Sequence, residues 1–351
     1  MEVNRKDFLE ILEKAMLAVL KKEHTALGCF VFEDDFIYSY NTEMMIAHKL
    51  PFEFENKFMV KADDLHKLLK KIPDEKIELL LKEKALQIKT KNLTANIQII
   101  TEGSFYKEIM KAHTKEEKWT NAPTNLYTGF EMCYMPDNNS YYVGICAKED
   151  RMMSMDGRLC GIYQLESEIG DFWIDNNAIK TILKIFPGKI DYVKYIDNSW
   201  ICLKKDGLIF SCRKIKDKKF NFEKFEELFT KYAKKDTDVS SIFPDEFANV
   251  IDRASLFAFN NKVISIEFLP GKITCKSDDK KNNFTETIQW KEKIETNILF
   301  RSDYSFFVYA LKRTSHFYLK EKPEYGKNEG KHIVFFTPGY NYKLIMKSLG
   351  D

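Results

Sequence analysis

A helix-forming segment that recurs along the chain constrains the fold more than any other feature of the sequence. Residues 62–73 read ADDLHKLLKKIP and residues 176–187 read NNAIKTILKIFP. In both, apolar residues recur at i, i+3, i+4 and i+7, which forms one face of a helix, and a proline ends the segment. A weaker copy, YSFFVYALKR, lies at residues 304–313. A chain that repeats one amphipathic helix is expected to contain copies of one structural unit.

The segments around these helices correspond as well. Residues 75–100 and 189–215 alternate apolar and polar residues between turn-like breaks, which predicts two meanders of three strands each. After the last copy come HFYLKEK, HIVFFTP and YNYKLIMKS, which predict the same arrangement. An earlier helix and a run of strands precede each copy, and these earlier helices are RKDFLEILEKAMLAVL, TNLYTGFEMCYM and PDEFANVIDRASLFA. The repeated unit is therefore helix, strands, helix, strands.

Two polar stretches with little apolar periodicity fall between the repeats. They lie at residues 107–125 and 231–243 and predict linkers. We therefore expect an α+β chain of three domains with one architecture, at residues 1–115, 120–235 and 241–351.

Composition limits how such a chain can function. The 351 residues are 44% hydrophobic, which is enough for a well-buried core, and 55 basic against 53 acidic residues leave a net charge of +2. A protein that held nucleic acid by bulk charge would usually be more basic, so any such role depends on how the charges are distributed. Seven dispersed cysteines without a C-x-x-C pair indicate reduced thiols, and no signal peptide or apolar span is recognisable, so we expect a soluble, intracellular protein.

Sequence motifs for catalysis or metal binding are missing. The sequence contains no Walker loop, G-x-G-x-x-G, H-E-x-x-H or G-x-S-x-G motif, and its six histidines lack ligand spacing with the cysteines. The carboxylates mostly neighbour lysines, as on solvated faces, and Asp156-Gly157 is typical of a turn. We expect no enzymatic activity, no cofactor and no metal site.

The repeats, with the stretches FIYSYNTEMMIAHKLP, RMMSMDGRLCGI and FPDEFANVIDRASLFA, resemble the bacterial DNA polymerase sliding clamp, the beta subunit of the replicative polymerase. The resemblance covers essentially the whole chain. It implies domains with two inner helices and outer antiparallel sheets, and two chains that close head to tail into a ring around duplex DNA. The partners it implies are double-stranded DNA, a DNA polymerase, a clamp loader and a second copy of the chain, in the cytoplasm at the nucleoid.

Basic residues of the repeated helices are the predicted DNA contacts. A closed ring holds DNA topologically, so it needs only weak, sequence-independent phosphate contacts. The predicted residues are Lys14, Lys21, Lys22, Lys67, Lys70, Lys71, Lys180, Lys184, Arg253, Lys312 and Arg313. The resemblance adds Tyr141 and Tyr142, which match aromatic residues that touch DNA in the family. The alternatives are solvated helix faces for the lysines and ordinary strand positions for the tyrosines, and His66 is expected to be a surface histidine.

The resemblance also implies a hydrophobic cleft between the second and third domains that binds short linear motifs of partner proteins. The matching positions are Tyr142, Val143, Met155, Gly157, Arg158, Leu159, Leu228, Leu344, Ile345 and Met346. The alternative for Met155, Ile345 and Met346 is plain core. Where the family has a Phe-Pro-Asp turn and a basic residue, this chain has Phe222-Glu223-Lys224 and Glu227, so a different motif preference is expected.

Two functions follow from this reasoning. The first is a processivity clamp that encircles DNA and tethers a polymerase. The alternative is a clamp-fold scaffold for protein–protein interactions that does not load on DNA. Positive charge on the inner helices distinguishes them, because a scaffold has no reason to keep it.

Overall fold

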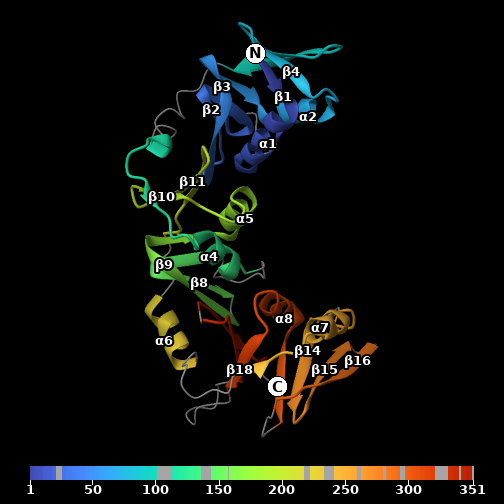
Figure 1. Ribbon diagram of the computed structural model, residues 1–351. Coiled ribbons are helices and arrows are strands. Elements are labelled where there is room, and N and C mark those ends of the chain that lie inside the picture. The colour runs from blue at the N-terminus through green and yellow to red at the C-terminus, as the bar shows by residue number, and fades with distance from the viewer. Residues whose placement is uncertain are drawn as a thin grey trace. The chain divides into compact units, whose positions relative to one another are not determined.

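The computed structural model (Figure 1) repeats helix, strands, helix, strands along the chain, as the sequence predicts. The six predicted helices are present as α1 (Arg5–Ala15), α2 (Ala62–Lys71), α4 (Leu126–Cys133), α5 (Asn176–Ile185), α7 (Phe247–Ser255) and α8 (Tyr304–Leu311). The described residues are 1–20, 26–100, 112–135, 144–156, 158–216, 222–232, 241–258, 262–279, 282–292, 297–320, 331–339 and 341–349.

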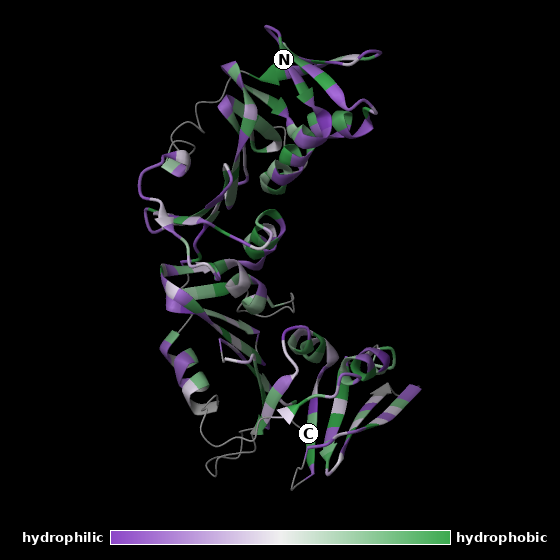
Figure 2. Ribbon diagram, viewed as in Figure 1, coloured by the Kyte–Doolittle hydropathy of each residue, from purple (hydrophilic) through white to green (hydrophobic). Residues whose placement is uncertain are grey.

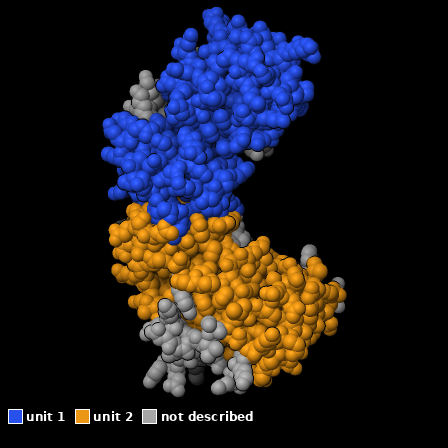
Figure 3. Space-filling model, in the orientation of Figure 1, with its two compact units in different colours: residues 1–127, 177–216 blue, residues 128–176, 217–351 orange. Residues whose placement is uncertain are grey.

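The chain divides into two compact units (Figure 3). Unit 1 comprises Met1–Tyr127 and Asn177–Lys216, and unit 2 comprises Thr128–Asn176 and Asp217–Asp351. The second repeat is shared between them because its strands pair in two directions: β12 (Leu208–Arg213) pairs with a strand of the first repeat, whereas β9 (Leu159–Ile174) pairs with one of the third. The division into three domains stays a prediction.

Unit 1 is built on a ten-stranded antiparallel sheet with the order β1-β4-β5-β6-β3-β12-β11-β10-β7, and β2 pairs with β3 beside this path. Its other strands are β1 (Glu2–Asn4), β2 (Cys29–Tyr40), β3 (Met44–Lys61), β4 (Lys76–Leu81), β5 (Ala85–Lys89), β6 (Thr94–Ile100), β7 (Thr120–Asn121), β10 (Tyr192–Ile196) and β11 (Trp200–Lys205). Both predicted three-strand meanders, β4–β6 and β10–β12, are thereby confirmed.

Apolar stripes attach helices to this sheet. Phe8 and Leu12 of α1 and Leu65 and Leu69 of α2 are fully buried in one cluster with strand side chains. Asn4 caps the start of helix α1, because its side chain accepts hydrogen bonds from two backbone N–H groups of the first turn. The polar sides of α1 and α2 are left at the surface, which is where the predicted lysines of these helices lie.

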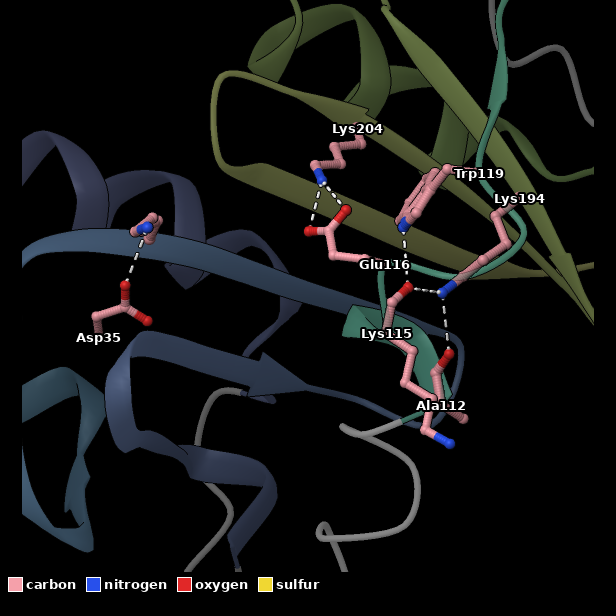
Figure 4. Close-up of polar contacts among 8 residues, drawn as sticks. Asp35, Ala112, Lys115, Glu116, Trp119, Lys194 and Lys204 are labelled. Atoms are coloured by element: carbon pink, nitrogen blue, oxygen red, sulfur yellow. Dashed lines mark hydrogen bonds and ion pairs between the residues drawn. The ribbon is translucent and has the colours of Figure 1, made fainter.

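The described part of the first predicted linker, residues 112–125, packs closely in unit 1 (Figure 4). The Lys194 side chain, 3% exposed, donates to the carbonyls of Ala112 and Lys115 at 3.1 and 2.9 Å, and its ammonium lies 4.7 Å from the centre of the Trp119 ring. Lys204 donates to both carboxylate oxygens of Glu116 at 2.8 Å. The sequence predicted a linker here, whereas the buried Lys194 side chain holds part of residues 112–125 against unit 1.

Unit 2 contains a six-stranded sheet, β13-β18-β19-β20-β9-β8, and a four-stranded sheet, β16-β15-β14-β17, both antiparallel. The remaining strands are β8 (Ile145–Asp156), β13 (Ser241–Ile242), β14 (Val263–Leu269), β15 (Lys272–Asp279), β16 (Asn282–Gln289), β17 (Ile298–Asp303), β18 (His316–Lys320), β19 (His332–Phe336) and β20 (Tyr342–Lys347). The third predicted meander is thus confirmed as β18–β20.

One helix of unit 2 was not predicted. Helix α6 (Phe222–Tyr232) precedes the second predicted linker and overlaps its start. The end of that linker is also part of the core, because the Phe243 ring stacks on Phe247 and Phe317 with centroids 4.2 and 3.8 Å away. The linker prediction for residues 231–243 was therefore wrong at both ends, since polar neighbours obscured the apolar positions.

Six of the seven cysteines are buried, Cys146 is half-buried, and all seven are free thiols, as predicted. None of the described helices is long and apolar enough to cross a membrane.

Candidate functional site

Charged side chains of α1, α2 and α5 line a cavity of about 610 Å³ in unit 1. The charged and titratable residues around it are Glu10, Glu13, Lys14, His66, Lys70 and Lys184. Three of the predicted DNA-contact lysines therefore lie around one hollow, although they come from three separate helices. Each helix directs its apolar stripe to the sheet, so its lysines point away from the core.

Acidic residues accompany these lysines. Lys70 Nζ lies 2.9 Å from Glu13 Oε1, and Lys14 Nζ lies 2.9 Å from Glu10 Oε1. The hydrogen bond from Lys70 lowers the pKa of Glu13, and the charges of Lys70, His66 and Lys184 lower it further. Glu13 is thus an anion beside the ammonium group of Lys70 and near that of Lys184. His66, predicted to be an ordinary surface histidine, is mostly covered, and burial followed by the charge of Lys70 lowers its pKa.

The other predicted basic residues of unit 1 that the structure describes are exposed. Lys67 pairs with Asp63 one turn earlier on α2, with Nζ and Oδ2 2.9 Å apart. Lys71 lies at the end of α2, and Lys180 lies on α5 one turn before Lys184. They stay predicted DNA contacts.

The three basic residues predicted in unit 2 have different surroundings. Arg253 of α7 donates two hydrogen bonds to the Glu286 carboxylate, at 2.6 and 2.9 Å. Lys312 is exposed just after α8. Arg313 instead donates to the carbonyls of Glu131, Met132 and Tyr134 at the end of α4, and its guanidinium lies 3.5 Å from the centre of the Tyr309 ring. Arg313 therefore caps a neighbouring helix, a role that the sequence analysis did not foresee.

Several predicted site residues lie outside the described residues. These are Lys21, Lys22, Tyr141, Tyr142, Val143 and Gly157. Leu228 is part of helix α6, and only its backbone is described.

The predicted partner-pocket residues lie on two faces of the six-stranded sheet. Leu159, Leu344 and Met346 are fully buried. They lie on the same face of the sheet as Tyr163 and Tyr342. Helix α4 packs against Tyr163, and the Tyr342 hydroxyl lies 3.5 Å from that of Tyr309 on α8. Met155 and Ile345 lie on the opposite face, and Arg158 is exposed at the β8–β9 turn. Because strand side chains alternate, one surface pocket cannot include all of them.

Helix α6 covers the face that Met155 and Ile345 share. Phe225 and Phe229 are 2% and 7% exposed and pack on Met153, Cys160 and Ile345. The α4 and α8 helices lie across the sheet from α6 (Figure 1). Figure 2 shows the alternation of hydrophobic and hydrophilic residues along α6 that this packing requires. The sequence did carry the signal, since Phe222, Phe225 and Phe229 recur at i, i+3 and i+7.

Polar contacts hold α6 at the margin of this face. The Arg151 guanidinium of β8 forms an ion pair with Glu226 of α6 and another with Glu149, at 2.7 Å. The Lys148 ammonium lies 5.0 Å from the centre of the Phe222 ring. Among the described residues, no group of three or more histidines, cysteines or carboxylates could hold a metal ion.

Comparison with known proteins identifies the fold. No family model matches the sequence, and no curated protein matches it. Solved structures match over the full length: the Helicobacter pylori beta clamp bound to a DNA ligase peptide (TM-score 0.81, 13% identity, 100% of both chains), the DNA polymerase beta subunit of Streptococcus pyogenes (0.80, 12%, 100% and 99%) and a putative DNA polymerase III beta subunit from Eubacterium rectale (0.77, 15%, 100% and 99%). The chain therefore has the α+β fold of bacterial beta clamps with a divergent sequence, which confirms the predicted fold class and resemblance.

Proposed function

We propose that the chain is a DNA sliding clamp, a non-enzymatic processivity factor that encircles duplex DNA and tethers a DNA polymerase. The observation that carries this proposal is the match to beta clamps along the entire chain, with all three repeats included. A fold alone does not define a function, so the proposal also depends on the surfaces that this chain presents. We place its action in the cytoplasm, at the nucleoid, with a clamp loader that opens the ring.

The surface proposed to face DNA is the polar side of the repeated helices. Lys67, Lys71, Lys180 and Lys184 are exposed there, and Lys70 joins them from α2. A ring needs no sequence-specific contact, so exposed surface ammonium groups suit weak, salt-sensitive phosphate binding. Net charge of the whole chain does not limit such a mechanism.

Ring closure requires a second copy of the chain, and unit 2 presents a suitable surface. Leu256, directly after α7, is 75% exposed, and the neighbouring Phe257 ring stacks on Phe284 of β16 at 5.4 Å. Strand β16 is an edge strand of the four-stranded sheet. An exposed leucine beside an open sheet edge is a surface that another chain can cover. We therefore propose that the homodimer contact includes Leu256 and β16.

The proposed partner site is the face of the six-stranded sheet that carries Met155 and Ile345. Support comes from the Helicobacter pylori clamp, which was crystallised with a DNA ligase peptide. A short peptide that anchors a few apolar side chains in such a site is a common recognition mode.

Retention on circular DNA tests the clamp function. The chain would be loaded onto nicked circular DNA with its loader, or by mild opening of the ring, and separated from free protein by gel filtration. A topological clamp stays on the circle in high salt and is lost when the DNA is linearised, whereas a protein bound by charge is lost in high salt from both. Negative-stain images of the crosslinked protein should show rings with a central hole. Particles of single-chain size at every concentration would contradict the proposal.

The second candidate, a scaffold that does not load on DNA, is favoured by one observation. Lys14, Lys67 and Lys70 are each paired with a carboxylate, as is Arg253. These pairs reduce the positive charge available to phosphates. Dimeric rings that never remain on circular DNA would select the scaffold.

A further inference from the structure

One carboxylate oxygen of Glu13, on α1, faces both a lysine and a histidine of α2. Glu13 Oε1 lies 2.9 Å from the Lys70 ammonium and 3.8 Å from Nε2 of His66. The first distance is that of a hydrogen-bonded ion pair, whereas the second is too long for a hydrogen bond. His66 and Lys70 are four positions apart, so they lie on the same side of α2. The two residues are therefore alternative partners of one acid.

The two partners differ in how well water can solvate them. The Lys70 side chain is 49% exposed, whereas that of His66 is 16% exposed. Nε2 of His66 is shielded from solvent and has no hydrogen-bond partner among the residues that the structure describes. An exposed ammonium group loses little free energy when it leaves an acid, because water takes the place of the acid. A protonated imidazole has no such replacement here, so it depends on Glu13 more than Lys70 does.

The charged groups around His66 come from three helices. They are Glu10, Glu13 and Lys14 of α1, Asp63 and Lys70 of α2, and Lys184 of α5. Burial and the charge of Lys70 lower the pKa of His66, whereas the charges of Glu13 and Asp63 act in the opposite direction. The imidazole is therefore neutral at pH 7 and above. At lower pH a proton on His66 adds one positive charge to the wall of the cavity.

A proton on His66 changes which group Glu13 binds. The imidazolium repels the Lys70 ammonium and attracts the carboxylate that holds it. Glu13 itself stays ionised in this pH range, because its own pKa is lowered. Lys14 gives a contrast within the same cavity, since it pairs with Glu10 of its own helix at 2.9 Å and this pair does not involve His66. Lys70 is therefore the lysine of this cavity whose pairing responds to the protonation of His66.

We propose that His66 is a positioning residue whose protonation releases Lys70 to bind DNA. When His66 is neutral, Glu13 holds Lys70; when it is protonated, Glu13 pairs with the imidazolium and Lys70 is available to a phosphate. This proposal rests on the proposed function in taking the polar side of α1, α2 and α5 as the surface that faces DNA. Linkage is reciprocal, so a phosphate near Lys70 and Lys184 favours the proton on His66, and the proton favours DNA binding. The affinity for duplex DNA therefore rises as the pH falls through the pKa of His66.

Fluorescence anisotropy with a short duplex, at fixed ionic strength between pH 7.5 and 5.5, tests this inference. The natural chain should bind at least roughly threefold more tightly at the lower pH, and His66→Gln should remove most of this gain. The matched control is His48→Gln. His48 of β3 lies in the same unit and is influenced by the charges of Lys14 and Glu10, but its Nδ1 lies 2.8 Å from the backbone carbonyl of Lys49. The control should keep the gain.

Lys70→Gln separates release of the lysine from direct contact by the histidine. Because His66 acts through Lys70, this variant should also lose most of the gain, and the half-exposed side chain can be replaced without loss of core packing. A gain that persists in Lys70→Gln would show that the imidazolium itself binds phosphate. A gain that persists in His66→Gln, or disappears in His48→Gln, would assign it to other groups. Each of these results would overturn the proposal, as would an affinity of the natural chain that does not change with pH.

NMR of the histidine rings measures the same coupling without DNA, with the His66 signal assigned by its absence in His66→Gln. Lys70→Gln should raise the pKa of His66, since it removes a cation that lowers this pKa and leaves Glu13 to the imidazolium. Glu13→Gln should lower the pKa further. If neither substitution shifts the titration of His66, the three groups are not coupled and the proposal fails even for a working clamp. If the titration shifts as expected but no duplex binds at any pH, the exchange at Glu13 is supported and the clamp proposal fails instead.

Discussion

The ammonium group of Lys70 lies 2.9 Å from a carboxylate oxygen of Glu13, so a lysine of α2 that we predict to contact DNA is held by an acid of α1. The pKa of Glu13 is lowered chiefly by this hydrogen bond and also by the nearby charges of His66 and Lys184. Glu13 is therefore ionised at neutral pH and lies beside Lys70 and near Lys184, two lysines that we propose contact phosphates.

Glu13→Gln should strengthen binding to duplex DNA. The substitution releases Lys70 and removes an anion close to Lys184, so we expect a gain of roughly three- to tenfold in affinity and a steeper dependence on salt, by about one additional ion. Fluorescence anisotropy with a short duplex between 50 and 200 mM salt measures both. The matched control is Glu2→Gln, which frees Lys76 on strand β4 from a pair of 2.7 Å. An equal gain in both variants would show that the effect is one of net charge.

Charge reversal of α2 should weaken the loading and processivity expected of a clamp without unfolding the protein. Lys67, Lys70 and Lys71 are exposed and none packs in the core, so replacing all three with Glu, which also puts acids beside Asp63 and Glu13, should lower the free energy of unfolding by no more than about 2–3 kcal/mol. Loading onto circular DNA and polymerase processivity should fall at least roughly tenfold, since three phosphate contacts are lost, whereas rings that do close should still be retained on the circle.

A control with the same total charge separates position from net charge in this experiment. The exposed residues Lys82, Lys84 and Lys91 lie on the turns between β4, β5 and β6. Replacing all three with Glu should leave loading onto circular DNA and polymerase processivity close to those of the natural chain. Unchanged loading and processivity in the Lys67, Lys70 and Lys71 variant would contradict the assignment of α2 to the DNA-facing surface.

The repeat could be predicted from the sequence because each copy buries the same stripe. Leu65 and Ile72 are buried, as are Ile179 and Phe186 at the corresponding positions of the second copy, so the periodicity was set directly by packing against a sheet. Strand pairing across repeats, such as β12 with β3, has no local signal. The division of the second repeat between two units could therefore not be read from the sequence.

The candidate site was less predictable for a related reason. Sequence similarity gives positions, whereas the role of a side chain depends on which face of its element it occupies and on what lies opposite. Ile345 and Met346 are adjacent, yet Ile345 contacts the cluster under α6 and Met346 is buried on the opposite face. Arg313 is a basic residue next to a repeated helix, as expected of a DNA contact, but its guanidinium donates hydrogen bonds to four backbone carbonyls. Such partners come from distant parts of the chain and leave no trace in the local pattern.

Arg313→Gln should destabilise unit 2. The guanidinium donates to the carbonyls of Glu131, Met132, Tyr134 and Tyr309 at 2.9–3.0 Å, so its loss removes a donor from each, although Met132 still accepts from the Tyr309 hydroxyl at 2.8 Å. Hydrogen bonds from a charged group contribute about 1.5–3 kcal/mol, and we expect a loss of about 2–3 kcal/mol in urea denaturation. The neighbouring exposed Lys312, changed to Gln, should cost less than about 0.5 kcal/mol. Equal effects of the two substitutions would contradict the capping role.

His113 should make the stability of unit 1 depend on pH. The side chain is 2% exposed, and burial, with a smaller contribution from the charge of Lys194, lowers its pKa from 6.5 to about 4. Between these pH values the unfolded chain binds a proton at His113 and the folded chain does not. The free energy of unfolding is therefore unaffected by this group above pH 6.5 and decreases as the pH falls from 6.5 toward 4. The difference corresponds to about 3 kcal/mol at most, since each pKa unit represents about 1.4 kcal/mol.

His113→Phe should remove this pH dependence, whatever its effect on stability at neutral pH. Urea unfolding followed by tryptophan fluorescence between pH 4.5 and 7.5 is a suitable measurement, because the Trp200 ring lies 4.9 Å from the imidazole. The control is Cys202→Ala, which removes the thiol 3.6 Å from Nδ1 but keeps the buried imidazole, and should therefore retain the full dependence on pH. Parallel curves for the natural chain and His113→Phe would show that the imidazole is not held neutral by burial, and the acid sensitivity of unit 1 would have to come from its ion pairs instead.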